Sequence, residues 1–141
     1  MNRKWGIALW MLWMSFAIAG CGNDPLATLN APLPAGLLTQ DLHVGTGPHP
    51  LGGQTVTISY SLSLADGTFV ESTVQRGRDF SWRFGSGEVI SGLEVGIASM
   101  NVGGHRKVTI PPNLAYGATG SPPAIPPNAT IVYDLWLSSA N

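Results

Sequence analysis

Apolar and polar side chains alternate strictly between residues 54 and 64. The apolar members of this alternation are Val56, Ile58, Tyr60, Leu62 and Leu64. A period of two places these side chains on one face of an extended chain, which predicts a strand with one buried face. Asp66-Gly67 follows and is typical of a hairpin turn. Residues 68–72 are therefore expected to form the partner strand.

Further segments continue this pattern. Alternation recurs at residues 80–84 and 131–137, which predicts two more strands. Residues 106–110 are expected to form another strand, which Pro111-Pro112 ends, and residues 37–44 a weaker first strand. Only one segment has helical spacing: Leu93, Ile97 and Met100 lie at i, i+4 and i+7. Because Gly92 and Gly96 lower its intrinsic propensity, this helix is expected to depend on tertiary packing.

Five or six strands and one helix predict the α+β class, with an antiparallel sheet packed on the helix. Parallel strands would need more helices as crossover connections. The proline-rich segment 116–130 lies between two predicted strands and contains Tyr116 and Ile125. We expect an ordered loop there, because proline fixes φ and restricts the unfolded chain.

The N-terminus has the pattern of an export signal. Basic residues at 3 and 4 precede an apolar run over 5–19, which is short for a membrane span. The run ends in Ile18-Ala19-Gly20-Cys21, which resembles the bacterial lipoprotein box and implies cleavage before Cys21 and a lipid on its sulfur. An ordinary signal peptide with an incidental cysteine, or an uncleaved anchor, are the alternatives.

This interpretation divides the chain into a signal peptide (1–20), a flexible tether (21–36) and a folded domain (37–141). Gly22 follows the cysteine, which resembles the pattern of lipoproteins sorted to the outer membrane. The expected location is therefore the bacterial cell envelope, with a lipid anchor in the outer membrane and the domain facing the periplasm.

Composition and charge exclude several classes of function. Hydrophobic residues make up 44% of the chain and charged residues 11%, and the net charge is −1, so no basic patch predicts nucleic-acid binding. The single cysteine allows no internal disulfide. The three histidines lack the spacing of metal ligands. No GxSxG nucleophile motif or complete phosphate-binding glycine motif is present.

A set of motifs instead resembles one family. In chain order the motifs are Asp66-Gly67, Glu71-Ser72, Phe80, FGSGEVISG at 84–92, Met100, Val102-Gly103, Ile110-Pro111, LAYG at 114–117 and IPPNAT at 125–130. Their order and spacing closely resemble those of the FKBP-type peptidyl-prolyl cis-trans isomerases, from about residue 36 to residue 137. The resemblance implies a half-barrel in which a curved sheet wraps around the short helix, with the active pocket between them.

The resemblance also implies the site residues. The catalytic set carried over by position is Tyr60, Glu71, Phe80, Ile90, Tyr116 and Tyr133. The substrate-binding set is Val70, Trp82, Val89, Leu93 and Ile125. The backbone N–H of Ile90 and the Tyr116 hydroxyl are expected to donate to a bound carbonyl. No metal or organic cofactor is implied.

The implied activity is rotation about X-Pro bonds in exported proteins. An apolar pocket favours the twisted amide over the planar, solvated one, so no nucleophile or base is required. The implied partners are proline-containing polypeptides and the macrolides tacrolimus and rapamycin, and a monomer is expected.

Three positions depart from the family pattern. Leu93 stands where many members have Trp, Val70 where Phe is usual, and Glu71 where Asp is usual. The last two motivate an alternative function, a module that binds proline peptides with little or no turnover. A structural envelope lipoprotein is the other alternative.

Overall fold

The computed structural model describes residues 32–141. The predicted signal peptide, Cys21 and residues 21–31 of the predicted tether lie outside the described residues. Within the described part of the chain, no helix combines the length and the apolar character that a membrane crossing requires.

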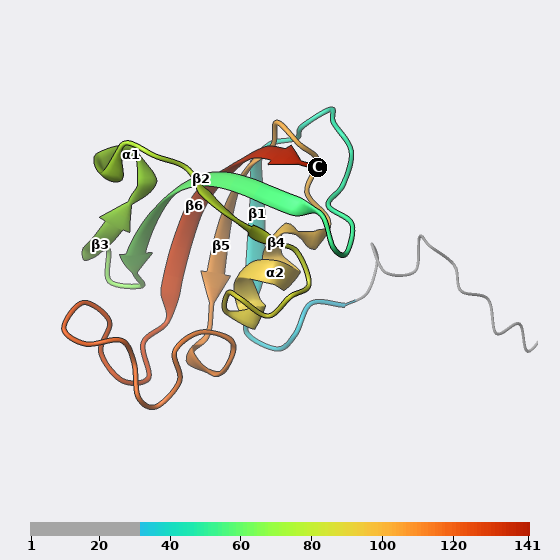
Figure 1. The fold of residues 1–141 in the computed structure, drawn as a ribbon. Coiled ribbons are helices and arrows are strands. Elements are labelled where there is room, and N and C mark those ends of the chain that lie inside the picture. The colour runs from blue at the N-terminus through green and yellow to red at the C-terminus, as the bar shows by residue number, and fades with distance from the viewer. Residues whose placement is uncertain (1–31) are drawn as a thin grey trace, which may run out of the picture.

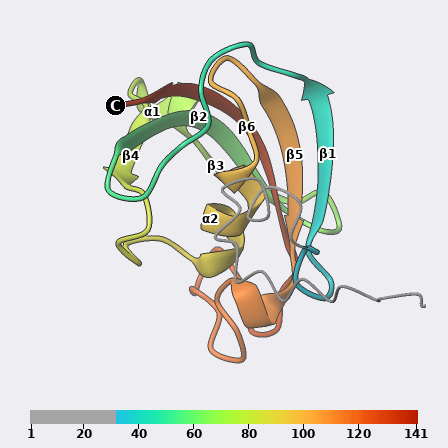
Figure 2. The same ribbon diagram turned by 90° about the vertical axis from the view of Figure 1, so that its right-hand side faces the viewer.

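Six antiparallel strands form one sheet. They are β1 (Leu38–His43), β2 (Thr55–Leu64), β3 (Phe69–Ser72), β4 (Phe80–Arg83), β5 (His105–Ile110) and β6 (Ile131–Ala140). The order is β1-β5-β6-β2-β3, and β4 also pairs with β2. The sheet curves around the helix α2 (Ser91–Ala98), which lies on its concave face (Figures 1 and 2). The predicted α+β fold is confirmed, and the sheet is open rather than closed.

Strand β2 changes partner along its length. Residues 55–58 pair with β4, whereas residues 61–63 pair with β3. Tyr60 lies between these two pairings, and the Thr73 side chain completes its backbone hydrogen bonds: Tyr60 N donates to Thr73 Oγ1 over 2.9 Å, and the same hydroxyl donates to Tyr60 O over 3.3 Å. The backbone of Tyr60 is thus fixed at the point where β2 leaves one partner for the other.

A short helix, α1 (Thr73–Arg76), links β3 to β4 and was not predicted. Ser72 caps its start by accepting from Val74 N over 3.2 Å, and Gly77 ends it in the left-handed conformation with φ of 68°. A serine at the N-cap and a glycine after the last residue are ordinary helix boundaries. Four residues are too few to show the apolar periodicity on which the prediction depended.

The two glycines of α2 allow it to lie close to the sheet. A Cβ on Gly92 would lie 2.2 Å from Ile110 Cγ2, and a Cβ on Gly96 would lie 2.7 Å from Val108 Cγ1. Both partners are fully buried residues of β5. Residues that weaken an isolated helix are therefore the ones that permit its packing. A short 3₁₀ helix, η1 (Pro112–Leu114), follows β5.

The far end of α2 is held by a buried arginine of β5. Arg106 donates to both carboxylate oxygens of Asp41, over 2.5 and 3.0 Å. Its Nη1 also donates to Gly96 O over 2.7 Å and to Ser99 Oγ over 2.9 Å. This one side chain connects β1, β5 and the C-terminal end of α2.

Candidate active site

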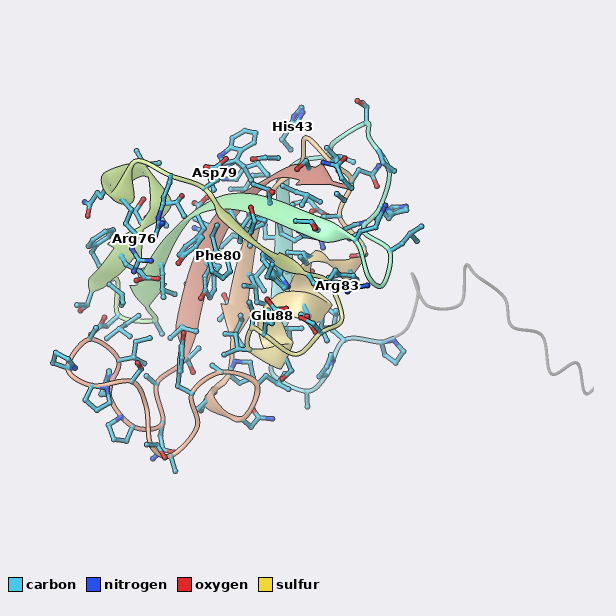
Figure 3. All side chains as sticks on the ribbon, viewed as in Figure 1. His43, Arg76, Asp79, Phe80, Arg83 and Glu88 are labelled. Carbon is cyan, nitrogen blue, oxygen red and sulfur yellow. The ribbon has the colours of Figure 1, made fainter. Side chains whose placement is uncertain are left out.

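A cleft of about 280 Å³ opens between α2, the sheet and the chain around α1. Its walls are formed by Tyr60, Glu71, Arg76, Phe80, Glu88, Val89, Ile90, Leu93, Tyr116 and Tyr133. Figure 3 shows Arg76, Phe80 and Glu88 in this order from α1 toward α2. Because the lining residues run from Tyr60 to Tyr133, the cleft combines elements that are far apart in sequence.

The base of the cleft is a cluster of aromatic rings. Tyr60 meets Phe80 edge to face, with ring centroids 6.2 Å apart, and tilts against Tyr133 at 5.1 Å. Behind Phe80 the ring of Trp82 stacks at 5.4 Å and is 3% exposed. Such contacts contribute beyond the apolar area they bury and hold the rings in fixed orientations.

The polar wall is built on Glu71. Its Oε1 accepts from the Tyr60 hydroxyl over 2.5 Å, and its Oε2 forms an ion pair with Arg76. Burial, and then the hydrogen bond to the Glu71 carboxylate and its negative charge, raise the pKa of Tyr60 above its ordinary value. Tyr60 therefore remains a neutral hydrogen-bond donor.

The backbone N–H of Ile90 and the hydroxyl of Tyr133 can also donate into the cleft. Ile90 is the N-cap of α2, and its carbonyl accepts from Leu93 N and Glu94 N. No acceptor for its own N–H lies among residues 32–141. Burial first, and then the nearby Tyr116, raise the pKa of Tyr133. The free N–H of Ile90 and the neutral phenols of Tyr60 and Tyr133 give the cleft hydrogen-bond donors.

The structure brings most of the predicted site residues together. Those on the cleft wall are Tyr60, Glu71, Phe80, Val89, Ile90, Leu93, Tyr116 and Tyr133. Trp82, Val70 and Ile125 do not line it. Trp82 packs behind Phe80, Val70 is half-buried against the core, and Ile125 is 4% exposed within its loop.

The loop that contains Ile125 is ordered by backbone hydrogen bonds. Ser121 and Ile125 exchange two of them, over 2.8 and 3.0 Å, and Asn128 N donates to Gly117 O over 2.9 Å. These bonds set the position at which Tyr116 enters the cleft wall.

Arg76 and Glu88 line the cleft but were not predicted as site residues. Glu88 lies inside the FGSGEVISG motif, directly before Val89 and Ile90, so its position could have been noticed. Arg76 lies in the unpredicted helix α1, and no regular spacing relates it to Glu71. Within the part of the chain that the structure describes, no three His, Cys, Asp or Glu side chains are grouped to hold a metal ion.

Comparison with known proteins identifies relatives of this domain. The family model described as FKBP-type peptidyl-prolyl cis-trans isomerase matches residues 47–138. FK506-binding protein 4 of Dictyostelium discoideum is 48% identical over 107 residues, which are 76% of this chain and 29% of that protein. The 46 kDa FK506-binding nuclear protein of Spodoptera frugiperda is 46% identical over 104 residues, 74% of this chain and 25% of that protein. The chain thus spans less than a third of the length of these two relatives.

A solved structure shows the same fold. The crystal structure of AtFKBP13 matches with a TM-score of 0.72 and 34% sequence identity. The match covers 77% of this chain and 95% of that one.

The relatives correct the predicted location. The bacterial cell envelope is contradicted, because these relatives are eukaryotic and the Spodoptera frugiperda protein, like a 39 kDa FK506-binding protein of Drosophila melanogaster, is named as nuclear. The prediction depended on a short N-terminal pattern, namely the basic residues 3 and 4, the apolar run 5–19, Ile18-Ala19-Gly20-Cys21 and Gly22. Such a pattern carries far less information than a match over about a hundred residues. The lipid on Cys21 itself lies outside the described residues and stays a prediction.

The family model extends from before β2 into β6 and contains every residue of the cleft wall. Sequence, fold and cleft agree, and the chain belongs to the FKBP-type peptidyl-prolyl cis-trans isomerase family.

Proposed function

We propose that the chain catalyses cis-trans isomerisation of X-Pro peptide bonds in polypeptides. The observation that supports this most is the cleft itself, in which aromatic and aliphatic walls surround a free backbone N–H and neutral phenol groups. The family to which the chain belongs is named for the same reaction.

The proposed mechanism needs no covalent step. Resonance in the amide sets a rotation barrier of about 18–20 kcal/mol. The twisted amide loses that resonance, so its carbonyl carries less negative charge and its nitrogen more lone-pair character. An apolar wall formed by Tyr60, Phe80 and Tyr133 favours this less polar carbonyl over the planar, solvated form. The difference in binding between the two forms lowers the barrier.

The donors orient the peptide. The Ile90 N–H and the Tyr116 hydroxyl are proposed to donate to peptide carbonyls, which fixes the chain while the bond to proline turns. Glu71 acts on the wall rather than on the substrate. By accepting from Tyr60 and pairing with Arg76 it holds the Tyr60 ring in place and keeps that phenol neutral.

A protease-coupled assay on the full chain tests the activity. The substrate is succinyl-Ala-Leu-Pro-Phe-p-nitroanilide, and Phe80→Ala is compared with Phe69→Ala. Phe69 is 49% exposed and does not line the cleft. We expect Phe80→Ala to lose about tenfold or more of kcat/KM, since about 1.4 kcal/mol of transition-state binding suffices for that loss. Phe69→Ala should retain the wild-type rate.

The alternative function is a proline-peptide binder with weak turnover. Val70 and Glu71 motivate it, since a smaller apolar side chain and a longer carboxylate replace the usual pair. FK506, which gives several relatives their names, is the probe for the binding site. If the folded chain binds FK506 but gives no rate above background, and Val70→Phe with Glu71→Asp restores a rate, the binding function replaces the enzymatic one.

Three further proposals rest on the sequence alone. They are a diacylglyceryl lipid on Cys21 with cleavage before it, a tether over residues 21–36 before the domain 37–141, and a monomeric state. The mass of the mature chain tests the first, because retention of residues 1–20 or a free thiol at Cys21 would contradict it. Limited proteolysis and sedimentation equilibrium test the other two.

A further inference from the structure

A second hollow adjoins the cleft at Arg76 and Phe80. This hollow encloses about 350 Å³ and is lined by Thr73, Arg76, Arg78, Asp79, Phe80 and Ser81. Arg76 and Phe80 belong to both walls. A peptide that places its proline in the cleft can therefore place a neighbouring residue in the hollow. We call this second space the basic hollow.

Several polar groups of the basic hollow are already occupied. The Thr73 hydroxyl is bonded to the Tyr60 backbone, and the Ser81 hydroxyl lies 2.8 Å from Thr57 Oγ1. Arg76 uses Nη2 for its bond to Glu71. A guanidinium has five N–H donors, so the others remain available to a ligand.

Arg78 and Asp79 are the other charged residues of the basic hollow. Neither has an ion-pair partner among residues 32–141. The wall holds two arginines and one aspartate. Glu71 offsets the charge of Arg76, so Arg78 supplies the positive charge that no carboxylate pairs with among residues 32–141. The Asp79 carboxylate opposes a doubly charged ligand more strongly than a singly charged one. The wall therefore suits one carboxylate.

The other end of the cleft has the opposite charge. Glu88 lines the cleft on the α2 side and has no ion-pair partner in the described part of the chain. Figure 3 shows Glu88 and Arg76 on opposite sides of Phe80. A peptide that crosses the cleft thus meets positive charge on one side of its proline and negative charge on the other.

We propose that the basic hollow is a subsite for an acidic side chain of the peptide substrate, bound by Arg78 together with the free donors of Arg76. This specificity rests on the proposed isomerase function. It also fixes the direction in which a charged peptide crosses the cleft, because reversal would place its acidic residue beside Glu88.

The test uses peptides of the form acetyl-X-Ala-Leu-Pro-Phe-Ala-Z-amide and measures isomerisation by NMR exchange spectroscopy. One end position carries Glu, Gln or Lys while the other carries Gln. At one of the two positions, Glu should give a kcat/KM about two- to fivefold above Lys, as expected for a partly exposed ion pair. Added salt should reduce this ratio.

Two arginine variants decide whether the preference arises in the basic hollow. Arg78→Gln should bring the Glu-to-Lys ratio close to one. The matched control is Arg83→Gln, which removes the same charge from the far end of β4 (Figure 3), where Arg83 donates to Gly53 O and lines neither space. The control should keep the wild-type ratio.

A ratio near one at both positions in the wild-type chain would overturn the proposal. A ratio that persists in Arg78→Gln, or that falls equally in Arg83→Gln, would also overturn it. The peptide with Gln at both ends separates this result from failure of the proposed function. If that neutral peptide shows no catalysed exchange, the isomerase function is wrong, whereas catalysed exchange without a charge preference rejects only the subsite.

Discussion

Two arginine–carboxylate pairs in this domain have different roles, one in the fold and one at the cleft. Arg106 and Asp41 join β5 to β1, and the arginine side chain is 6% exposed whereas the aspartate side chain is 44% exposed. Arg76 and Glu71 lie at the rim of the cleft, where the side chains are 51% and 29% exposed. The guanidinium is buried in the first pair and half-exposed in the second.

The difference lies in the remaining hydrogen-bond partners. Arg106 also donates to Gly96 O and Ser99 Oγ, so its guanidinium is enclosed by protein acceptors and has little left for a ligand. Arg76 has one protein acceptor, Glu71. A buried guanidinium with several protein acceptors fixes the fold, because its removal leaves polar groups unsatisfied. A rim pair with spare donors contributes little to stability and remains available to a ligand.

The largest expected effect comes from removing the buried arginine. Arg106→Met should lower the free energy of unfolding by about 3 kcal/mol, since it leaves Gly96 O and Ser99 Oγ without their donor. The loss of the ion pair adds little, because water solvates the 44% exposed Asp41 carboxylate. Urea unfolding of the full chain, followed by circular dichroism, measures this. Arg106→Lys should recover only part of the loss, because an ammonium group cannot replace the planar fork. A loss below about 1 kcal/mol would show that the two pairs do not differ as described.

Breaking the rim pair should affect activity instead. Glu71→Gln removes the charge that pairs with Arg76 and weakens the bond to the Tyr60 hydroxyl. We expect kcat/KM to fall about tenfold, which corresponds to about 1.4 kcal/mol, while the free energy of unfolding changes by less than about 1 kcal/mol. The two quantities are measured on the same preparation by the peptide assay and urea unfolding. A large loss of stability with unchanged kcat/KM would reverse the roles of the two pairs.

High pH should reveal the tyrosines beside the rim pair. The pKa values of Tyr60 and Tyr133 are raised in the folded state, mainly by burial. Unfolded tyrosine loses its proton near pH 10, whereas the folded chain keeps these two protons. The free energy of unfolding should therefore fall as pH rises above about 10, by at most about 1.4 kcal/mol per pH unit for each retained proton. Urea unfolding at about pH 9 and about pH 11 measures the fall.

Tyr60→Phe is the control for this pH dependence. The variant should show a smaller fall between the two pH values than the wild-type chain, with the remainder due to Tyr133. Equal falls in both proteins would mean that the folded state does not raise the pKa of Tyr60.

The smallest expected effect comes from restoring the usual apolar residue on β3. Val70 is half-buried against the core and does not line the cleft. Val70→Phe should therefore change kcat/KM by about twofold or less, with a modest gain if the larger ring reaches the substrate. Leu64→Phe, at another partly buried position outside the cleft wall, is the matched control. A tenfold gain at position 70 alone would show that Val70 limits turnover.

Much of the fold could be predicted from the sequence because its signals are local. The alternation in β2 and β6 shows which side chains face the core, and Asp66-Gly67 marks the turn between β2 and β3. The helix α1 was missed because its only signals are the boundary residues Ser72 and Gly77. The packing of α2 against the sheet could not be predicted from the sequence either, because the contact between Gly92 and Ile110 joins residues that are distant in the chain.

The sequence alone determined which residues alternate, where the chain turns and which motifs occur together, because these depend on neighbouring residues and their spacing. Only the tertiary structure decided that Glu71 binds both Tyr60 and Arg76, that Trp82 lies behind Phe80, and that Arg78 lies in a hollow beside the cleft. These relations arise where β2 exchanges one partner strand for another and the chain between those strands folds back as α1. Contacts of this kind depend on the path of the chain in space, which no local pattern of side chains specifies.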